Sequence, residues 1–150
     1  MNKKTIETEL SAMRGWEADG NRATRLQTYA RSLGYTVDIT GDACKGDKVM
    51  FARAKFTGSR RRPKFAGIEI ITGEIVKDSY GYAKSQHTFT IKTGGEKMMI
   101  KGRNLYGIAT FAKPRETDDR RDALDDKHER GEQARERKIV MQEMREKYLV

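Results

Sequence analysis

The chain has 150 residues, which is enough for one compact domain with extensions but not for two independent hydrophobic cores. Charged residues make up 35% of the sequence and hydrophobic residues 36%, so part of the chain is expected to lie outside any core. The formal net charge is +9, and the single cysteine, Cys44, excludes an internal disulfide framework and a multi-cysteine zinc site.

The sequence shows neither a membrane span nor an export signal. No apolar run reaches the length of a membrane span, and the first residues lack the apolar stretch of a signal peptide. We therefore expect a soluble, cytoplasmic protein that does not act at a membrane.

The excess positive charge lies in the middle of the chain. The net charge is +2 for residues 1–34, +8 for residues 35–113 and −1 for residues 114–150. Because the excess is local, the sequence predicts a basic surface that meets an anionic partner.

Residues 1–34 show helical periodicity. Apolar residues recur at helical spacing in two stripes, Ile6, Leu10 and Met13, and then Ala23, Leu26, Ala30 and Leu33. The second stripe ends at Gly34, a typical helix stop. We expect a helical hairpin packed on the next unit. A DNA-binding helix-turn-helix is the alternative, but no third helix is present to fix a recognition helix.

From residue 35 to residue 113 the apolar period changes from 3.6 to 2, which predicts strands. The strand-like segments are 35–39, 49–56, 65–76, 87–92 and 97–100, with turn signals at Gly41-Asp42, Thr57-Gly58, Thr72-Gly73 and Gly94-Gly95. Segment 65–76 is either one long strand or two strands bent at Gly73. Without helices between them the strands should pair antiparallel, and a small curled barrel would bury them and hide their edges.

Short motifs in this segment follow a recognisable order. Gly46-Asp47-Lys48-Val49-Met50-Phe51 and Thr72-Gly73-Glu74-Ile75-Val76 each open a strand, and His87-Thr88-Phe89-Thr90-Ile91 with Lys97-Met98-Met99-Ile100 closes a hairpin. This order resembles the SH3-like small barrels of the KOW and translation-protein type. The resemblance implies a five-stranded antiparallel barrel over about residues 46–111. Such barrels often contact RNA, DNA or nucleoprotein, and many bind proteins instead.

Residues 114–150 are predicted to form a long charged helix, because residues 116–148 contain no proline and only Gly131 as a breaker. An apolar stripe returns at the end, formed by Val140, Met141, Met144 and Tyr148. We predict this stripe as a partner-binding patch, with packing on the barrel as the alternative. The predicted architecture is α+β: helical hairpin 1–34, basic antiparallel SH3-like barrel 35–113 and charged helix 114–150.

The strongest functional signal is Ser59-Arg60-Arg61-Arg62-Pro63-Lys64. Consecutive arginines cannot all face one side of a strand, and proline lacks a ladder donor, so a solvent-facing loop is expected. Arginine forks match phosphate oxygens, and an anionic partner relieves the repulsion between them. The alternative is a solvated loop that confers solubility. We predict phosphate contacts by the cations of this basic segment, namely Lys55, Arg60, Arg61, Arg62, Lys64, Lys84, Lys101 and Arg103.

Several aromatic residues are interleaved with these charges. Tyr80 and Tyr82, in a glycine-containing segment, are the candidates for stacking on unpaired bases. Phe56 and Phe65 are expected to belong to the core.

No motif demands a reaction. Glu74 and Lys77 are three residues apart, whereas a metal-dependent nuclease strand needs its acid and lysine two apart, on one face. The acidic residues around His128 lack the second histidine of a zinc-protease motif. Cys44 and His87 lack a third group and an oxyanion hole. We expect no enzymatic activity, no metal and no cofactor.

Together these features favour a non-enzymatic nucleic-acid-binding accessory protein that contacts the phosphate backbone of DNA or RNA through a basic barrel face. The alternative is a protein–protein interaction module or inhibitor, of the kind that phages or mobile elements encode. It would dock on a nucleoprotein enzyme through its basic face and its C-terminal helix.

Overall fold

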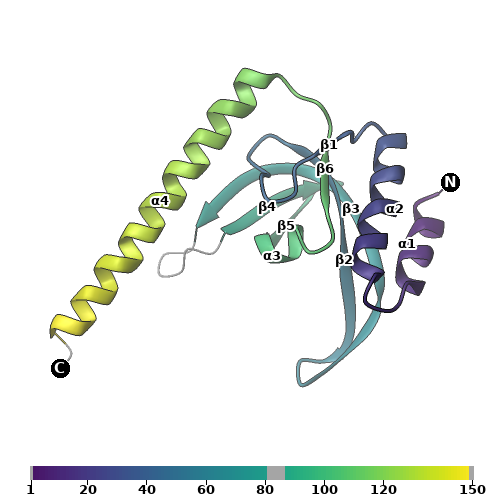
Figure 1. Ribbon diagram of the computed structural model, residues 1–150, viewed down its shortest axis with the longest axis horizontal. Helices are drawn as coiled ribbons and strands as arrows, with labels where there is room; N and C mark the ends of the chain where they lie inside the picture. The colour runs from purple at the N-terminus through teal and green to yellow at the C-terminus, as the bar shows by residue number, and fades with distance from the viewer. Residues whose placement is uncertain (1, 81–86, 149–150) are drawn as a thin grey trace.

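The computed structural model describes residues 2–80 and 87–148 (Figure 1). Its elements are α1 (Lys3–Ala12), α2 (Ala18–Ser32), β1 (Val37–Asp38), β2 (Lys48–Ser59), β3 (Arg62–Tyr80), β4 (His87–Thr93), β5 (Glu96–Lys101), α3 (Gly102–Leu105), β6 (Thr110–Ala112) and α4 (Thr117–Tyr148). The predicted α+β class is confirmed, with helices at the N-terminus, an antiparallel sheet and a long C-terminal helix.

The sheet has six strands in the order β1-β6-β2-β3-β4-β5, and every pair in it is antiparallel. It is open, with β1 and β5 at its two edges. The sequence predicted five strands, because β6 has three residues and is too short to show an alternating pattern. The resemblance to SH3-like barrels stays a prediction.

Residues 65–76 belong to one long strand, β3, and not to two strands bent at Gly73. β3 runs unbroken through Gly73, and its register with β4 shifts between Ile75 and Lys77, which marks a bulge. A Cβ at Gly73 would lie 2.6 Å from Ile91 Cγ2 and 2.7 Å from the Lys92 carbonyl oxygen. Glycine is therefore needed there for the close approach of β4, and not for a turn.

Alternate residues of the sheet supply two hydrophobic cores. Met50 and Ala52 of β2 face the helical hairpin, whereas Val49 and Phe51 face the concave side of the sheet. The core under the helices also contains Ile6, Leu10, Leu26, Tyr29, Ala30, Ile68, Ile70, Ala109 and Phe111. The concave core contains Ile39, Ala43, Ile75, Phe89, Ile91, Ile100, Leu105 and Ala112. Residues of α1 and α2 thus pack in one core with residues of the sheet.

Helix α1 also covers an edge that the sheet leaves open. Between the tip of the β2–β3 hairpin and Glu74, β3 has β2 on one side and no strand on the other in the described residues. There the Ile68 N–H donates to Ser11 Oγ (2.8 Å) and the Ile70 N–H donates to Glu7 Oε2 (2.8 Å). These side-chain acceptors replace a missing strand and protect the edge.

Helix α4 lies on the side of the sheet away from α1 and α2, and its C-terminal end extends past the sheet (Figure 1). Lys127, Gly131 and Ala134 share one face of the helix and are buried. None of the described helices is long and apolar enough to cross a membrane.

Candidate nucleic-acid interface

The β2–β3 hairpin projects from the body of the molecule and carries the basic run (Figure 1). The strands stay paired up to Ser59 opposite Arg62, so only Arg60 and Arg61 form the turn. The predicted loop is shorter than expected because the residues from Arg62 onward belong to β3. Pro63 is tolerated in this part of β3 because β4 pairs with β3 only from Glu74 onward, so one side of the strand is an open edge here.

Gly58 fixes the geometry of this turn. It has φ = +89°, and a Cβ there would lie 2.8 Å from the Arg62 carbonyl oxygen. Only glycine adopts this conformation without strain and without a clash. The Thr57-Gly58 turn signal thus marks the last pairs of the hairpin, and the turn itself lies two residues later.

Seven of the predicted phosphate-binding cations are described, and all are exposed. They are Lys55, Arg60, Arg61, Arg62, Lys64, Lys101 and Arg103. In the described parts of the chain no ion pair or hydrogen bond engages the side chain of any of them. The structure brings five of them together on the hairpin and sets Arg103, in α3, against its base. Lys101 lies at the end of the edge strand β5.

Phe56 and Phe65 are not core residues, which corrects the sequence-based expectation. Their exposed fractions are 63% and 45%. The β2–β3 register shifts after Lys55, leaving Phe56 directly opposite Phe65, with ring centroids 6.3 Å apart and edge-to-face. A bulge moves the inward alternation of β3 by one residue, so Phe65 joins Phe56 on the face that the helices cover farther along the sheet.

The two rings line an open groove of about 740 Å³ between the hairpin, the start of α2 and the α3–β6 segment. Two of its cations have partners: Arg53 pairs with Glu69 at 2.7 Å, and Arg22 pairs with Asp19 at 3.4 Å and also donates to the Leu10 and Met13 carbonyl oxygens. The cations of the groove that keep no such contact are Lys55 and Arg103, and Asn104 also lines it.

The side chains of the other predicted site residues lie outside the described part of the chain or on α4. Tyr82 and Lys84 lie outside the described residues, and of Tyr80 only the backbone, at the end of β3, is described. On α4, Val140 and Met144 are 52% and 54% exposed, and Met141 is half-buried. The side chain of Tyr148 lies outside the described residues. Partner binding by this patch stays a prediction.

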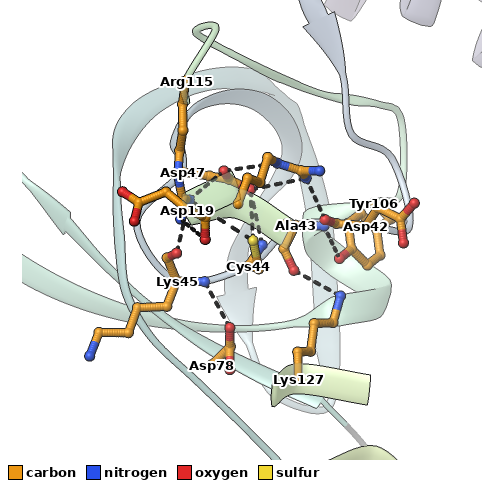
Figure 2. Close-up of polar contacts among 11 residues, drawn as sticks. Asp42, Ala43, Cys44, Lys45, Asp47, Asp78, Tyr106, Arg115, Asp119 and Lys127 are labelled. Carbon is orange, nitrogen blue, oxygen red and sulfur yellow. Dashed lines mark hydrogen bonds and ion pairs between the residues drawn. The ribbon is translucent and has the colours of Figure 1, made fainter. Parts of the chain in front are cut away.

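Sequence reasoning missed a polar cluster around the loop before β2 (Figure 2). Asp47 is 1% exposed and accepts from the Cys44 N–H at 3.0 Å. Arg115 donates to Asp47 Oδ1 at 2.8 Å, and Arg120 donates to both Asp47 oxygens at 3.2 Å. Asp78, 4% exposed, accepts from the Lys45 N–H at 2.7 Å.

The same cluster fixes α4 to the sheet. Lys127, 4% exposed, donates to the Ala43 carbonyl oxygen at 2.8 Å and lies 5.7 Å from the Phe89 ring centroid. Arg130 pairs with Asp78. Burial lowers the pKa of Lys127. The sequence did contain a signal, since Lys127, Gly131 and Ala134 fall on one helix face, but the surrounding charges hid it.

The cluster has no reactive group. Burial, with the nearby charge of Asp47, raises the pKa of Cys44 to about 11, so the thiol stays protonated at neutral pH. Within residues 2–80 and 87–148, no group of histidine, cysteine and acidic side chains is arranged to hold a metal ion. The cluster therefore acts as a structural anchor.

Comparison with known proteins gives two matches. Residues 44–114 match a family model described as "Domain of unknown function (DUF7699)", a range that holds every strand except β1. The chain is also 36% identical over 122 residues to zinc finger CCCH domain-containing protein 62 of Oryza sativa subsp. japonica. That alignment covers 71% of this chain but only 17% of the relative. No solved structure matches. These 150 residues include one cysteine, so they contain no CCCH finger.

Proposed function

We propose that this chain is a nucleic-acid-binding accessory protein that contacts phosphate groups through the β2–β3 hairpin. The observation that carries the proposal is a set of cations on a projecting hairpin that form no ion pair with any described residue, namely Lys55, Arg60, Arg61, Arg62 and Lys64. A charge-rich protein can satisfy its cations internally, as the anchor of α4 does. On the hairpin the cationic side chains are exposed, and they form no ion pair within the described residues.

The shape of the hairpin supports this proposal. A two-stranded antiparallel ribbon with an arginine turn presents Lys55 from β2, Arg62 and Lys64 from β3, and two guanidinium groups from the tip. Arginine binds phosphate with two parallel N–H donors, and each phosphate contact displaces condensed counterions. The rest of the surface adds further unpaired cations at Lys101 and Arg103.

The relative's name contributes little to this proposal, because the zinc finger that it mentions is absent from these 150 residues. The chain shares only a fraction of that protein's length. The proposal therefore depends on the hairpin and must be tested there.

The test replaces Arg60, Arg61 and Arg62 together by alanine. Binding of a fluorescein-labelled duplex is measured by anisotropy at about 50 mM and about 200 mM salt. We expect affinity to fall by about tenfold or more, and the salt slope to fall by about one unit for each phosphate that the variant no longer neutralises. Lys92→Ala with Lys97→Ala, on the exposed β4–β5 hairpin, is the control for the removal of positive charge. Equal affinities of the triple variant and the parent would refute the proposal.

A further inference from the structure

We infer that the groove beside Phe56 is a binding site for an unpaired base, so that the preferred ligand is single-stranded nucleic acid. This inference rests on the proposed function, since the same hairpin holds the backbone. The inference goes further because it states that the ligand is single-stranded and names the residues that contact its base.

The first observation is the exposure of two aromatic rings in a cluster of cations. Exposing a phenylalanine ring to water costs free energy that burial would recover. Two adjacent exposed rings are therefore uncommon on a protein surface that binds no ligand. One face of Phe65 is already covered, since the Arg14 guanidinium lies 5.9 Å from its centroid. Phe56 is the more exposed ring, at 63%, and is therefore the stacking platform.

The second observation is the charge of the groove. Asp19 and Glu69 are its acidic lining residues, and each is paired with an arginine of the groove, Arg22 at 3.4 Å and Arg53 at 2.7 Å. Lys55 and Arg103 then supply uncompensated positive charge beside the rings. A ligand with an aromatic ring and a phosphate satisfies both features at once.

The third observation is the presence of a polar side chain on the groove wall. Asn104 is exposed, and within the described part of the chain no hydrogen bond engages its amide. An amide donates and accepts together, which suits the edge of a base. The groove volume of about 740 Å³ is in the range of small-ligand sites.

These features select single strands over duplexes. In a duplex the bases are stacked on each other, and only their edges reach a protein. A single strand can turn a base out onto an aromatic ring while its backbone follows a basic ribbon. The base type is not specified by stacking, so DNA and RNA strands share the chemistry that this groove recognises.

The experiment compares fluorescein-labelled oligo(dT) and oligo(rU) of about 12 nucleotides with a duplex of equal length, using the full chain. We expect tighter binding of both single strands than of the duplex. Phe56→Leu, which keeps an apolar side chain but removes the ring, should weaken single-strand binding by about tenfold. Phe56→Tyr should retain it, because the ring remains. The two oligonucleotides together show whether the sugar matters.

The control is Met99→Ala, which removes a 72% exposed apolar side chain from β5 outside the groove. It should leave affinity unchanged. Chemical-shift changes on adding oligo(dT) should centre on Phe56, Arg103 and Asn104. Equal binding of strand and duplex, or no effect of Phe56→Leu, would overturn the inference. If the arginine variant still weakened binding in that case, the proposed function would stand. Failure of every nucleic acid to bind would remove both.

Discussion

Two groups of arginines in this protein look alike in the sequence and have opposite surroundings. The side chains of Arg60, Arg61 and Arg62 are exposed on a hairpin and have no partner among residues 2–80 and 87–148. Arg115, just before α4, and Arg120, near the start of α4, reach a carboxylate that is 1% exposed. The difference shows that the location of a buried acceptor, and not the local density of charge, decides whether an arginine is structural.

The net charges of the two segments also show that charge density does not decide which arginines are structural. Residues 114–150 carry a net charge of −1, yet several of their cations are drawn inward to the loop before β2. Residues 35–113 carry +8, and their hairpin arginines remain in solvent. Net charge located the basic surface correctly, but it could not distinguish cations that hold the fold together from cations available to a ligand.

The largest effect is expected from Asp47→Ala. The change removes the acceptor shared by Arg115, Arg120 and the Cys44 N–H. Removing one partner of a buried charge pair is strongly destabilising, and because both guanidinium groups keep partial solvent contact we expect about 3 kcal/mol. For a chain of this size that lowers Tm by about 6–12 °C. Differential scanning calorimetry measures it.

Asp122→Ala is the matched control, because it removes one carboxylate from an exposed position of α4 and changes the net charge equally. Its Tm should stay within about 2 °C of the parent. Equal losses of stability in the two variants would show that α4 is not anchored through Asp47, and the contrast between the two groups of arginines would fail.

The fold could largely be predicted from periodicity, since the change from a 3.6 period to a 2 period located the helices and the longer strands. The features that periodicity did not predict are a short strand and a shift in strand register. β6, with three residues, gave no pattern. Phe56 lies on the face that the helices cover farther along the sheet, and the register shift after Lys55 brings Phe65 to the same face, but here the hairpin projects from the body of the molecule (Figure 1), so both rings are exposed and not in the core. A register shift depends on pairing between distant segments, which a linear pattern does not contain.

The candidate site was predicted in part. The arginine run and Lys55 were found because a cluster of basic residues in a strand-turn-strand segment is visible in the sequence. The groove was not found, because it joins the hairpin to Arg103 and Asn104, about 50 residues away in the chain. The anchor at Asp47 was hidden for the same reason: its partners lie 68 and 73 residues farther along the chain.

A smaller effect on stability is expected from His87. This residue lies near Lys127, on the side of the sheet where α4 is anchored, so its titration tests that side of the comparison. Burial, with the charge of Lys127, lowers the pKa of His87 to about 4. The unfolded chain, with a pKa near 6.5, therefore binds the proton first, and stability should fall as pH drops from about 6.5 toward 4. Because His87 is only half-buried and solvent screens its charge, His87→Gln should remove about 1 kcal/mol of the loss between pH 7 and pH 5, about half of what the full shift would give.

Urea unfolding midpoints at the two pH values measure this effect. His128→Gln is the control, because it removes the other histidine, which is exposed on α4. A His87→Gln variant with the same pH dependence as the parent would show that His87 is accessible in the folded state.

The smallest effect on stability is expected where the charge is most concentrated. Replacing Arg60, Arg61 and Arg62 by alanine breaks no ion pair or side-chain hydrogen bond in the described part of the chain, so Tm should change by less than about 2 °C. At low salt it should rise slightly, since like charges repel less after the change, and this gain should disappear as salt screens the repulsion. Arg120→Ala removes a single cation, but it breaks bonds to Asp47 and to the Asp42 carbonyl oxygen, and should lower Tm by several degrees. Calorimetry of both variants at low and high salt makes the comparison. A triple variant that melts well below Arg120→Ala would mean that the hairpin arginines serve the fold, and it would leave the groove beside Phe56 without a backbone-binding surface.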